Sequence, residues 1–426
     1  MNQVAHYVPF FELPDEQRVV VTGLGTICPV GNDVATAWQA LVDGRSGIGP
    51  ITKFDTEPFG DAIAGEIRDF HPEEVIPKKE LRRMTIPARY AVVSAQEAIA
   101  DAGLVVDESN AEEVGVVYGS AGGGYHMILE QEQIFRTRGA RRVSPFLISH
   151  MLPDAASGHI AIMVGARGPN LSPASACSTG TAAVGEAMET IRRGDARIVI
   201  SGGTDEPLLP VLMAGFQALR GLASHEDPTK ACRPFDANRN GFVVGEGAAA
   251  LVLESLASAK ERKVNCYAEV IGYGSSNDAH DMEAPHPSAR GPALAMSMAL
   301  RKTGLPLEEV DYINPHGTGT PMNDKVETAA IKAVFGEHAY NLAVSSTKSM
   351  VGHLMGGSGA LEALATVKTI SEGVIPPTIN YETPDPECDL DYVPKVARQA
   401  EVGVALSNSI GLGGHNASVI FRRIDG

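Results

Sequence analysis

The sequence predicts an α/β fold in which sheets are covered by helices on both faces. Short runs of β-branched residues recur along the chain, and many of them are almost entirely apolar, as strands buried on both faces are. Segments with a helical apolar stripe lie between several of these runs. Glycine accounts for 45 of the 426 residues, which allows closely packed layers.

Each expected element has a local signal. The expected strands are short, apolar and rich in β-branched residues. In chain order they span residues 19–22, 114–118, 197–201, 249–253, 268–271, 310–313, 342–345, 404–407 and 418–421. The clearest helices are expected at 87–102, which begins with a proline, and at 179–193, where Val184, Met188 and Ile191 share one stripe.

A faint internal repetition indicates two halves that are built alike. Residues 170–194 and 341–373 each read as a strand-like opening, a turn of small residues and a helix that ends at Gly. We therefore expect an N-terminal half at 18–265 and a C-terminal half at 266–426. Residues 1–17 are expected to form an extension ahead of the fold.

Charge and cysteine content limit the partners and the compartment. The formal net charge is −17, the opposite of the basic footprint of a nucleic-acid binder. The N-terminus lacks the basic region of a secretory signal, and no run reaches the roughly 18 apolar residues of a membrane span. The five cysteines form no C-x-x-C pair. They favour a reducing, cytoplasmic location over a disulfide scaffold or a zinc site.

Cys177 is the first candidate for chemistry. It lies in the segment SACSTG, after an extended stretch and before the helix expected at 179–193. Unpaired N–H groups and the positive end of the helix dipole stabilise a thiolate, so we expect a lowered pKa and a nucleophilic thiol. The alternative is a buried cysteine with a structural role, the common state of a free cysteine.

Two histidines follow expected strands among Gly and Thr residues. His316 lies in NPHGTGT and His353 lies in KSMVGH. Polar residues at strand ends of α/β folds converge on sites, so both are candidates for hydrogen-bond or proton chemistry. The alternatives are ordinary surface or core histidines, or a metal pair. A metal pair lacks a third ligand at helical spacing here.

Longer motifs resemble the elongating beta-ketoacyl-[acyl-carrier-protein] synthases. They are VVVTGLGTICPVGND, GPNLSPASACSTG, RPFDANRNGFVVGEGAAALVLE, NPHGTGTPMND, SSTKSMVGHLMGGSGALE and GLGGHN. They occur in family order between Arg18 and Arg423. The resemblance implies a thiolase-like fold, a five-layer αβαβα body of two similar halves, and a homodimer. It also implies decarboxylative condensation of an acyl enzyme with malonyl-acyl-carrier protein in fatty-acid elongation.

The resemblance implies a role for each residue that matches a motif. Cys177 is the nucleophile that carries the acyl group. His316 and His353 donate hydrogen bonds to the malonyl thioester carbonyl. Lys348 and Glu362 form an ion pair that orients the site.

The same resemblance implies how the substrates are held. The backbone N–H groups of Cys177 and Leu412 form the oxyanion hole, and Thr318 and Thr320 contact the phosphopantetheine arm. No metal is implied, and no cofactor other than the phosphopantetheine that carries the substrates. The carrier protein is expected to dock on a basic patch made of Lys78, Lys79, Arg82, Arg83 and Arg220, with Arg141 and Arg142 from the dimer partner.

The acyl pocket departs from the family pattern. Ile410 and Leu412 stand where two Phe residues are usual, and the second of these gates the pocket. Gly122 stands where a larger residue such as Ile often narrows the tunnel. These changes predict a more permissive pocket. The alternative is compensation, in which Tyr125, Met127 or Ile410 fills the space.

Other functions remain as alternatives. A thiolase needs a second cysteine in a late glycine loop, and the only late cysteine is Cys388, in PDPECDLDY. A chain-starting synthase would pair its cysteine with His and Asn, whereas this chain has His353. A non-catalytic chain-length-factor subunit would lack Cys177. A ketosynthase of a type II polyketide or polyene pathway would share every motif, so the pathway stays open.

Overall fold

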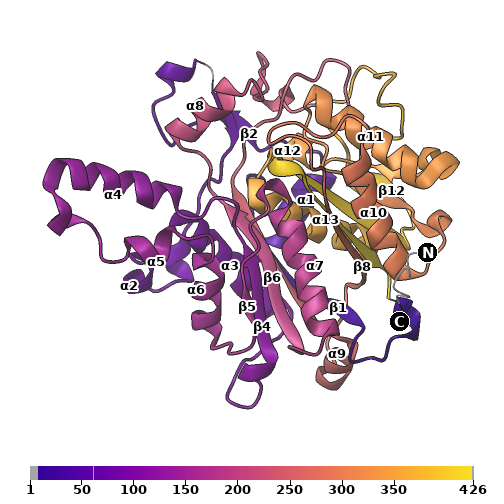
Figure 1. Cartoon of the computed structure of the whole chain (residues 1–426), viewed down its shortest axis with the longest axis horizontal. Helices are drawn as coiled ribbons and strands as arrows, with labels where there is room; N and C mark the ends of the chain where they lie inside the picture. Colours follow the sequence, from indigo (N-terminus) through magenta and orange to yellow (C-terminus); the bar gives the residue numbers. More distant parts are fainter. Residues whose placement is uncertain (1–7, 61, 425–426) are drawn as a thin grey trace.

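Two sets of five strands build the main sheet of the computed structural model, which describes residues 8–60 and 62–424 (Figure 1). The N-terminal set is β1 (Val19–Ile27), β4 (Val114–Gly119), β5 (Asn170–Leu171), β6 (Ile198–Asp205) and β7 (Gly247–Ser255). The C-terminal set is β8 (Ala268–Asn277), β9 (Tyr312–Asn314), β10 (Ala343–Val344), β13 (Val404–Gly411) and β14 (His415–Arg422). Two small sheets pair β2 (Ile48–Pro50) with β3 (Ile63–Gly65), and β11 (Val374–Ile375) with β12 (Arg398–Gln399).

The strand order repeats between the two sets. The spatial order is β1-β7-β6-β4-β5 in the first and β8-β14-β13-β9-β10 in the second. In both, the first strand of the set neighbours the last, followed by the fourth, the second and the third. The sets join where Val19–Val21 of β1 pairs antiparallel with 268–270 of β8. The predicted two similar halves are therefore confirmed, and the predicted boundary at 265 falls just before β8.

Helices cover both faces of each half. α3 (Ile86–Asp101) and α6 (Ala155–Val164) pack on the N-terminal strands, and α10 (Arg290–Thr303) and α11 (Pro321–Phe335) lie together on the C-terminal side. Between the sheets, α7 (Thr179–Arg192) and α13 (Ser358–Glu372) contact strands of both halves. This arrangement gives the predicted five layers, with α7, the helix that follows Cys177, in the middle layer.

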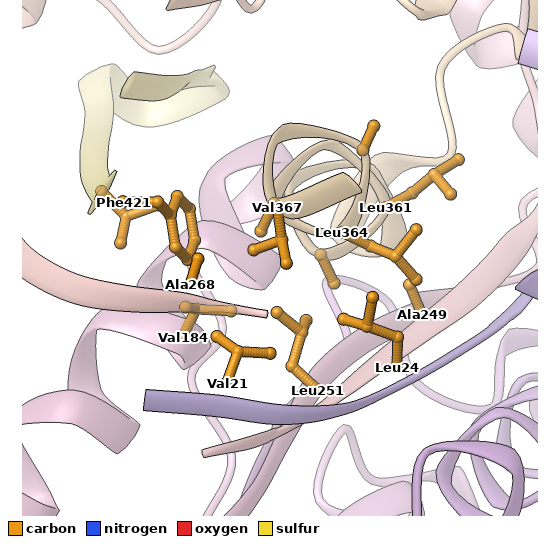
Figure 2. Close-up of a cluster of buried hydrophobic side chains, with 14 of the residues drawn as sticks. Val21, Leu24, Val184, Ala249, Leu251, Ala268, Leu361, Leu364, Val367 and Phe421 are labelled. Carbon is orange, nitrogen blue, oxygen red and sulfur yellow. The ribbon is translucent and has the colours of Figure 1, made fainter. Parts of the chain in front are cut away.

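The main core lies where α13 meets the sheets (Figure 2). Leu364 and Val367 of α13 lie next to Leu24 and Leu251 of the N-terminal strands, and Leu361 belongs to the same cluster. All five side chains are almost completely buried. Burial of this kind contributes about 25 cal/mol per Å² of apolar surface, so the middle helices are held firmly between the sheets.

The remaining helices lie at the periphery or beside the central layer. They are α1 (Val34–Val42), α2 (Lys78–Leu81), α4 (Tyr125–Arg138), α5 (Leu147–Met151), α8 (Pro210–Ala218), α9 (Leu256–Arg262) and α12 (Lys348–Val351). Helix α4 projects from the body as an arm (Figure 1). None of the helices within the described ranges is long and apolar enough to cross a membrane.

Strand β1 is longer than the segment expected at 19–22. It continues through Gly23 and Gly25, where only glycine fits against α3. A Cβ on Gly23 would lie 2.1 Å from the carbonyl oxygen of Ala98, and a Cβ on Gly25 would lie 2.0 Å from that of Ser94. These glycines allow α3 to lie directly on the strand. The expected strand at 310–313 begins later, at Tyr312, while the other expected strands are present with shifted ends.

The described part of the N-terminal extension packs on the body. Phe10 is only 2% exposed and belongs to the core of the C-terminal half. The backbone carbonyl of Asp15 accepts a hydrogen bond from Ala257 N at 3.0 Å. Residues 1–7 of the extension lie outside the described residues.

Candidate active site

Cys177 lies in a tight turn, η6 (Ala176–Ser178), from which α7 continues. Its side chain is 9% exposed, and the preceding Ala176 has a left-handed backbone with φ of 51°. Gly411, the last residue of β13, packs closely against this turn: a Cβ on it would lie 3.1 Å from Cys177 N. The N–H groups of Leu412 and of Cys177 itself both face the thiol.

The predicted lowering of the Cys177 pKa is wrong. Burial raises the pKa of the thiol to about 11, and the charge of Asp205 adds to this rise. The Leu412 N–H, the positive charge of Lys348 and the residue's own N–H act in the opposite direction. Together they do not offset the effect of lost solvation on the pKa. The sequence prediction considered the helix N-terminus and left this effect out. The raised pKa favours the neutral thiol.

His316 and His353 meet in one buried pocket. His316 follows β9, and His353 follows α12. Their ring centroids lie 5.2 Å apart with the planes at 81°, and each side chain is 3% exposed. Phe242 connects this pair to Cys177: its ring lies 5.7 Å from that of His353, and it packs against the apolar cluster that contains Cys177. The fold thus gathers the three predicted residues at one place.

Burial favours the neutral form of both imidazoles. Burial holds the pKa of His353 well below its usual range, and Lys348 lowers it further. The same two causes act on the pKa of His316, with His353 as a third. Nδ1 of His353 lies 2.9 Å from Ser358 Oγ and accepts the N–H of Met355 at 3.3 Å. The ring proton therefore resides on Nε2.

One ring nitrogen of each histidine is left for a ligand. Nε2 of His353 and Nδ1 of His316 are buried and have no hydrogen-bond partner among the residues that the structure describes. A buried polar atom without a partner costs free energy, so such atoms at a site indicate a bound group. Nδ1 of His316 and Nε2 of His353 are such atoms.

Lys348 and Glu362 form a buried ion pair. Their side chains are 1% and 2% exposed. Burial raises the pKa of Glu362 to about 7, while Lys348 opposes the rise. The charge of Lys348 also lowers the pKa values of both histidines, adding to the larger effect of burial.

Two acidic residues that hold the His316 loop were missed in the sequence. Glu327 accepts the backbone N–H groups of His316 at 2.7 Å and Gly317 at 2.8 Å. Asp324 accepts the N–H of Gly319 at 3.2 Å. Both acids lie in the first two turns of α11, directly after NPHGTGT, where carboxylates can reach the donors of the preceding loop. That spacing was the available signal.

The space beside Gly122 is already occupied. A Cβ on Gly122 would lie 1.8 Å from Cε2 of Tyr125. The compensating arrangement, in which Tyr125 fills the place of the missing side chain, is therefore the one observed. Ile410 is buried at 8% exposure, whereas Leu412 is 44% exposed.

The other predicted contact residues lie at the pocket rim or on the surface. Thr318 is buried, and its Oγ1 lies 3.1 Å from that of Thr320, which caps α11. The predicted docking residues are all exposed, on α2, after α4 and after α8: Lys78, Lys79, Arg82, Arg83, Arg141, Arg142 and Arg220.

Two family models match the chain. The Beta-ketoacyl synthase, N-terminal domain, matches residues 16–259, and the Beta-ketoacyl synthase, C-terminal domain, matches residues 267–382. A 3-oxoacyl-[acyl-carrier-protein] synthase 2 from Synechocystis sp. is 49% identical over 410 residues, which cover 96% of this chain and 99% of the relative.

Solved structures agree with this assignment. The ishigamide ketosynthase/chain length factor has a TM-score of 0.89 at 37% identity, covering 96% of this chain and 99% of the other. The type II polyketide ketosynthase AntDE, solved with the acyl-carrier protein AntF, has a TM-score of 0.85 at 32% identity and the same coverage. The chain belongs to the beta-ketoacyl-[acyl-carrier-protein] synthase family, the thiolase-like condensing acyltransferases.

Proposed function

We propose that this chain joins an acyl group on Cys177 to malonyl-acyl-carrier protein by decarboxylative condensation. The observation that carries the proposal is the pair of neutral, buried histidines with unpartnered ring nitrogens beside a buried cysteine. In the first step, Cys177 Sγ bonds to the acyl carbonyl carbon, and the carbon–sulfur bond to the carrier breaks. The proton of the Cys177 thiol ends on the departing phosphopantetheine sulfur.

The backbone N–H groups of Cys177 and Leu412 stabilise the oxyanion of this first step. Both already face the thiol, and both favour negative charge at that place. Donors fixed by the backbone need no reorganisation as charge develops. Thr318 and Thr320 are assigned to the phosphopantetheine arm.

In the second step, His316 and His353 bind the malonyl thioester carbonyl oxygen. The carboxylate leaves as carbon dioxide, and its bonding electrons form an enolate whose oxygen the two histidines stabilise. The enolate carbon then attacks the acyl carbonyl on Cys177. The bond to Sγ breaks, the product is 3-oxoacyl-carrier protein, and the thiolate regains a proton from solvent. The Lys348–Glu362 ion pair orients the site and keeps the histidines neutral.

The direct test combines acyl-carrier proteins of increasing length with malonyl-carrier protein and identifies the products by mass spectrometry. Fatty-acid elongation predicts one two-carbon extension of saturated acyl groups. Absence of any 3-oxoacyl product at every length would rule the proposal out.

A ketosynthase of a polyketide or polyene pathway is the second candidate. The solved ishigamide ketosynthase/chain length factor and AntDE support it, at 37% and 32% identity. The 49% identity to a 3-oxoacyl-carrier-protein synthase 2 supports fatty-acid elongation more strongly. The two differ in acceptor: a faster reaction with polyunsaturated or polyketo acyl-carrier proteins than with saturated ones would favour the second candidate.

Tyr125 is proposed to limit acyl length. The family's acyl tunnel passes the position of Gly122, and the Tyr125 ring occupies the space there. Tyr125→Ala is expected to raise the rate with the longest acyl groups about tenfold relative to short ones, because it removes the ring from the tunnel. Competition between long and short acyl-carrier proteins measures this ratio. Tyr340→Ala, at an exposed tyrosine on another face, serves as the control, and an unchanged length profile in Tyr125→Ala would contradict the assignment.

The exposed basic residues of α2 and its neighbours are proposed to dock the acidic carrier. Charge reversal at Lys78 and Lys79 is expected to raise KM for acyl-carrier protein about tenfold, because the patch attracts an anionic partner. The rate with a short acyl-pantetheine thioester should not change. Arg301→Glu, an exposed residue on α10, is the matched control. Equal loss with both substrates would place these residues outside the dock.

A homodimer is proposed from an uncovered sheet edge. β5 is the last strand of the sheet, and Leu171 on it is 46% exposed. Nearby elements also present apolar side chains to solvent, including Ile128 and Phe135 of the α4 arm and Ile162 of α6. An exposed edge beside apolar surface is a pairing site. Light scattering should give twice the mass of one chain.

A further inference from the structure

Asp205 is a buried carboxylate at the end of β6, with 3% exposure. Its Oδ1 accepts Ser120 Oγ at 2.6 Å and Gly122 N at 3.1 Å. Its Oδ2 accepts Ala121 N at 3.1 Å and Gly356 N at 2.7 Å. Three of the four donors are backbone N–H groups. They can only donate, so they cannot accept a hydrogen bond from a protonated carboxyl group. Burial raises the pKa of Asp205, and the four donated hydrogen bonds oppose this rise by favouring the ionised carboxylate.

These hydrogen bonds join two segments that lie against each other, since a Cβ on Gly356 would lie 2.7 Å from Ala121 N. The first, Ser120–Gly122, carries the glycine against which Tyr125 packs. The second is the turn η10 (Met355–Gly357), which follows His353. Asp205 is thus a single side chain that reaches both the proposed acyl pocket and the histidine loop.

The turn connects Asp205 to the ring of His353. Asp205 Oδ2 accepts the N–H of Gly356 at 2.7 Å, and the adjacent N–H of Met355 donates to Nδ1 of His353 at 3.3 Å. Because Nδ1 accepts the N–H of Met355, it carries no hydrogen itself, and the ring proton lies on Nε2. Nε2 is the nitrogen with no partner among the described residues.

The turn is strained and tightly enclosed. Met355 has a left-handed backbone with φ of 49°. The Gly356 carbonyl fits against two glycines, since a Cβ on Gly203 would lie 2.3 Å from it and one on Gly180 would lie 2.9 Å from it. A strained backbone persists only where its surroundings determine it, and the Asp205 carboxylate is the charged part of those surroundings.

We propose that Asp205 is a positioning residue for His353: it holds the turn at Met355–Gly357 so that His353 presents Nε2–H to the malonyl thioester. This inference rests on the proposed function for the identity of the ligand. Asp205 acts through His353 and through the turn, and it holds the Ser120–Gly122 loop at a fixed distance from them.

The test is Asp205→Asn. This change keeps the shape but places an NH₂ group opposite two donors, so the turn and the ring should move. Decarboxylation of malonyl-carrier protein per Cys177 site is expected to fall about 10- to 100-fold, with KM changed less than about twofold. In a His353→Ala background, adding Asp205→Asn should change the rate less than about twofold, because a residue that acts through His353 has nothing left to position.

Glu97→Gln is the matched control. Glu97 on α3 also accepts two backbone N–H groups, Thr26 at 2.8 Å and Val34 at 2.7 Å, and contacts no residue of the site among these bonds. Its decarboxylation rate per site should equal that of the wild type. Ser120→Ala, which removes one of the four bonds, should reduce the rate about two- to fivefold and covers the case in which Asp205→Asn does not fold.

Nitrogen-15 spectra of histidine-labelled protein give a readout that does not depend on activity. The wild type should show His353 protonated on Nε2, and Asp205→Asn should show a mixture of tautomers. A wild-type rate in Asp205→Asn with an unchanged spectrum would overturn the inference, as would a full-size effect of Asp205→Asn in the His353→Ala background. If the wild type itself does not decarboxylate malonyl-carrier protein, the proposed function fails, while the spectra still decide whether Asp205 positions His353.

Discussion

Cys177→Ala is expected to abolish condensation, with a loss on the order of 10⁴-fold or more, because no other group can carry the acyl chain. The other four cysteines lie elsewhere: Cys28, Cys232 and Cys388 are buried in other surroundings, and Cys266 lies between α9 and β8. Formation of 3-oxoacyl-carrier protein from acyl- and malonyl-carrier proteins measures the effect. Cys266→Ala, which removes a thiol far along the chain from the site motifs, should retain the wild-type rate.

The same variant separates the two halves of the reaction. The histidines proposed to bind the malonyl thioester remain in Cys177→Ala, so decarboxylation of malonyl-carrier protein should still be measurable. Condensation that continued in Cys177→Ala at more than a few per cent of the wild-type rate would mean that a different nucleophile is used.

His316→Ala and His353→Ala are each expected to slow decarboxylation about 10²- to 10³-fold, the cost of losing one donor to a developing oxyanion. Both variants should still load acyl groups on Cys177, because the oxyanion hole of that step consists of backbone N–H groups. Release of carbon dioxide from labelled malonyl-carrier protein and mass measurement of the acyl enzyme follow the two steps separately.

His338→Ala is the matched control for these variants. His338 is partly buried, and its Nε2 lies 2.9 Å from the carbonyl oxygen of Val310. Val310 precedes β9, whereas His316 follows it, so His338 lies at the other end of this strand. It should decarboxylate at the wild-type rate. A His316 or His353 variant that behaved in the same way would have no part in holding the enolate.

The fold class could be predicted because strands covered on both faces are apolar along their whole length. β4 and β6 are buried at every position, and both had been expected from their sequence. The spatial order of the strands could not be predicted in the same way, because nothing within Val114–Gly119 specifies that it pairs with Ile198–Asp205 and not with another strand. β5 was expected only as the strand-like opening of residues 170–194, because its two residues are both exposed and carry no apolar pattern.

The candidate catalytic residues could be proposed from the sequence more readily than the residues that hold them. Cys177, His316 and His353 stand in motifs with a chemical reason of their own. The roles of Glu327 and Asp205 depend on which backbone N–H groups the folded chain places opposite them, and no local pattern contains that information. Burial also reversed the expected direction of the Cys177 pKa shift. The sequence shows the helix N-terminus, but it does not show how much solvation the thiol loses in the fold.

Tyr125 illustrates the same limit at the acyl pocket. Gly122 alone indicates a missing side chain. The structure shows that the ring of Tyr125, the first residue of α4, fills this space. Close packing makes such compensation common in protein interiors. A pocket is therefore judged from both residues together.

The most direct test of the account is the mass of the protein after incubation with an acyl-carrier protein in the absence of malonyl-carrier protein. The account predicts one acyl group per chain, located by peptide mapping on the peptide that contains Cys177, and no adduct in Cys177→Ala. An adduct of normal yield in Cys177→Ala, or one mapped to any other residue of the wild type, would contradict it.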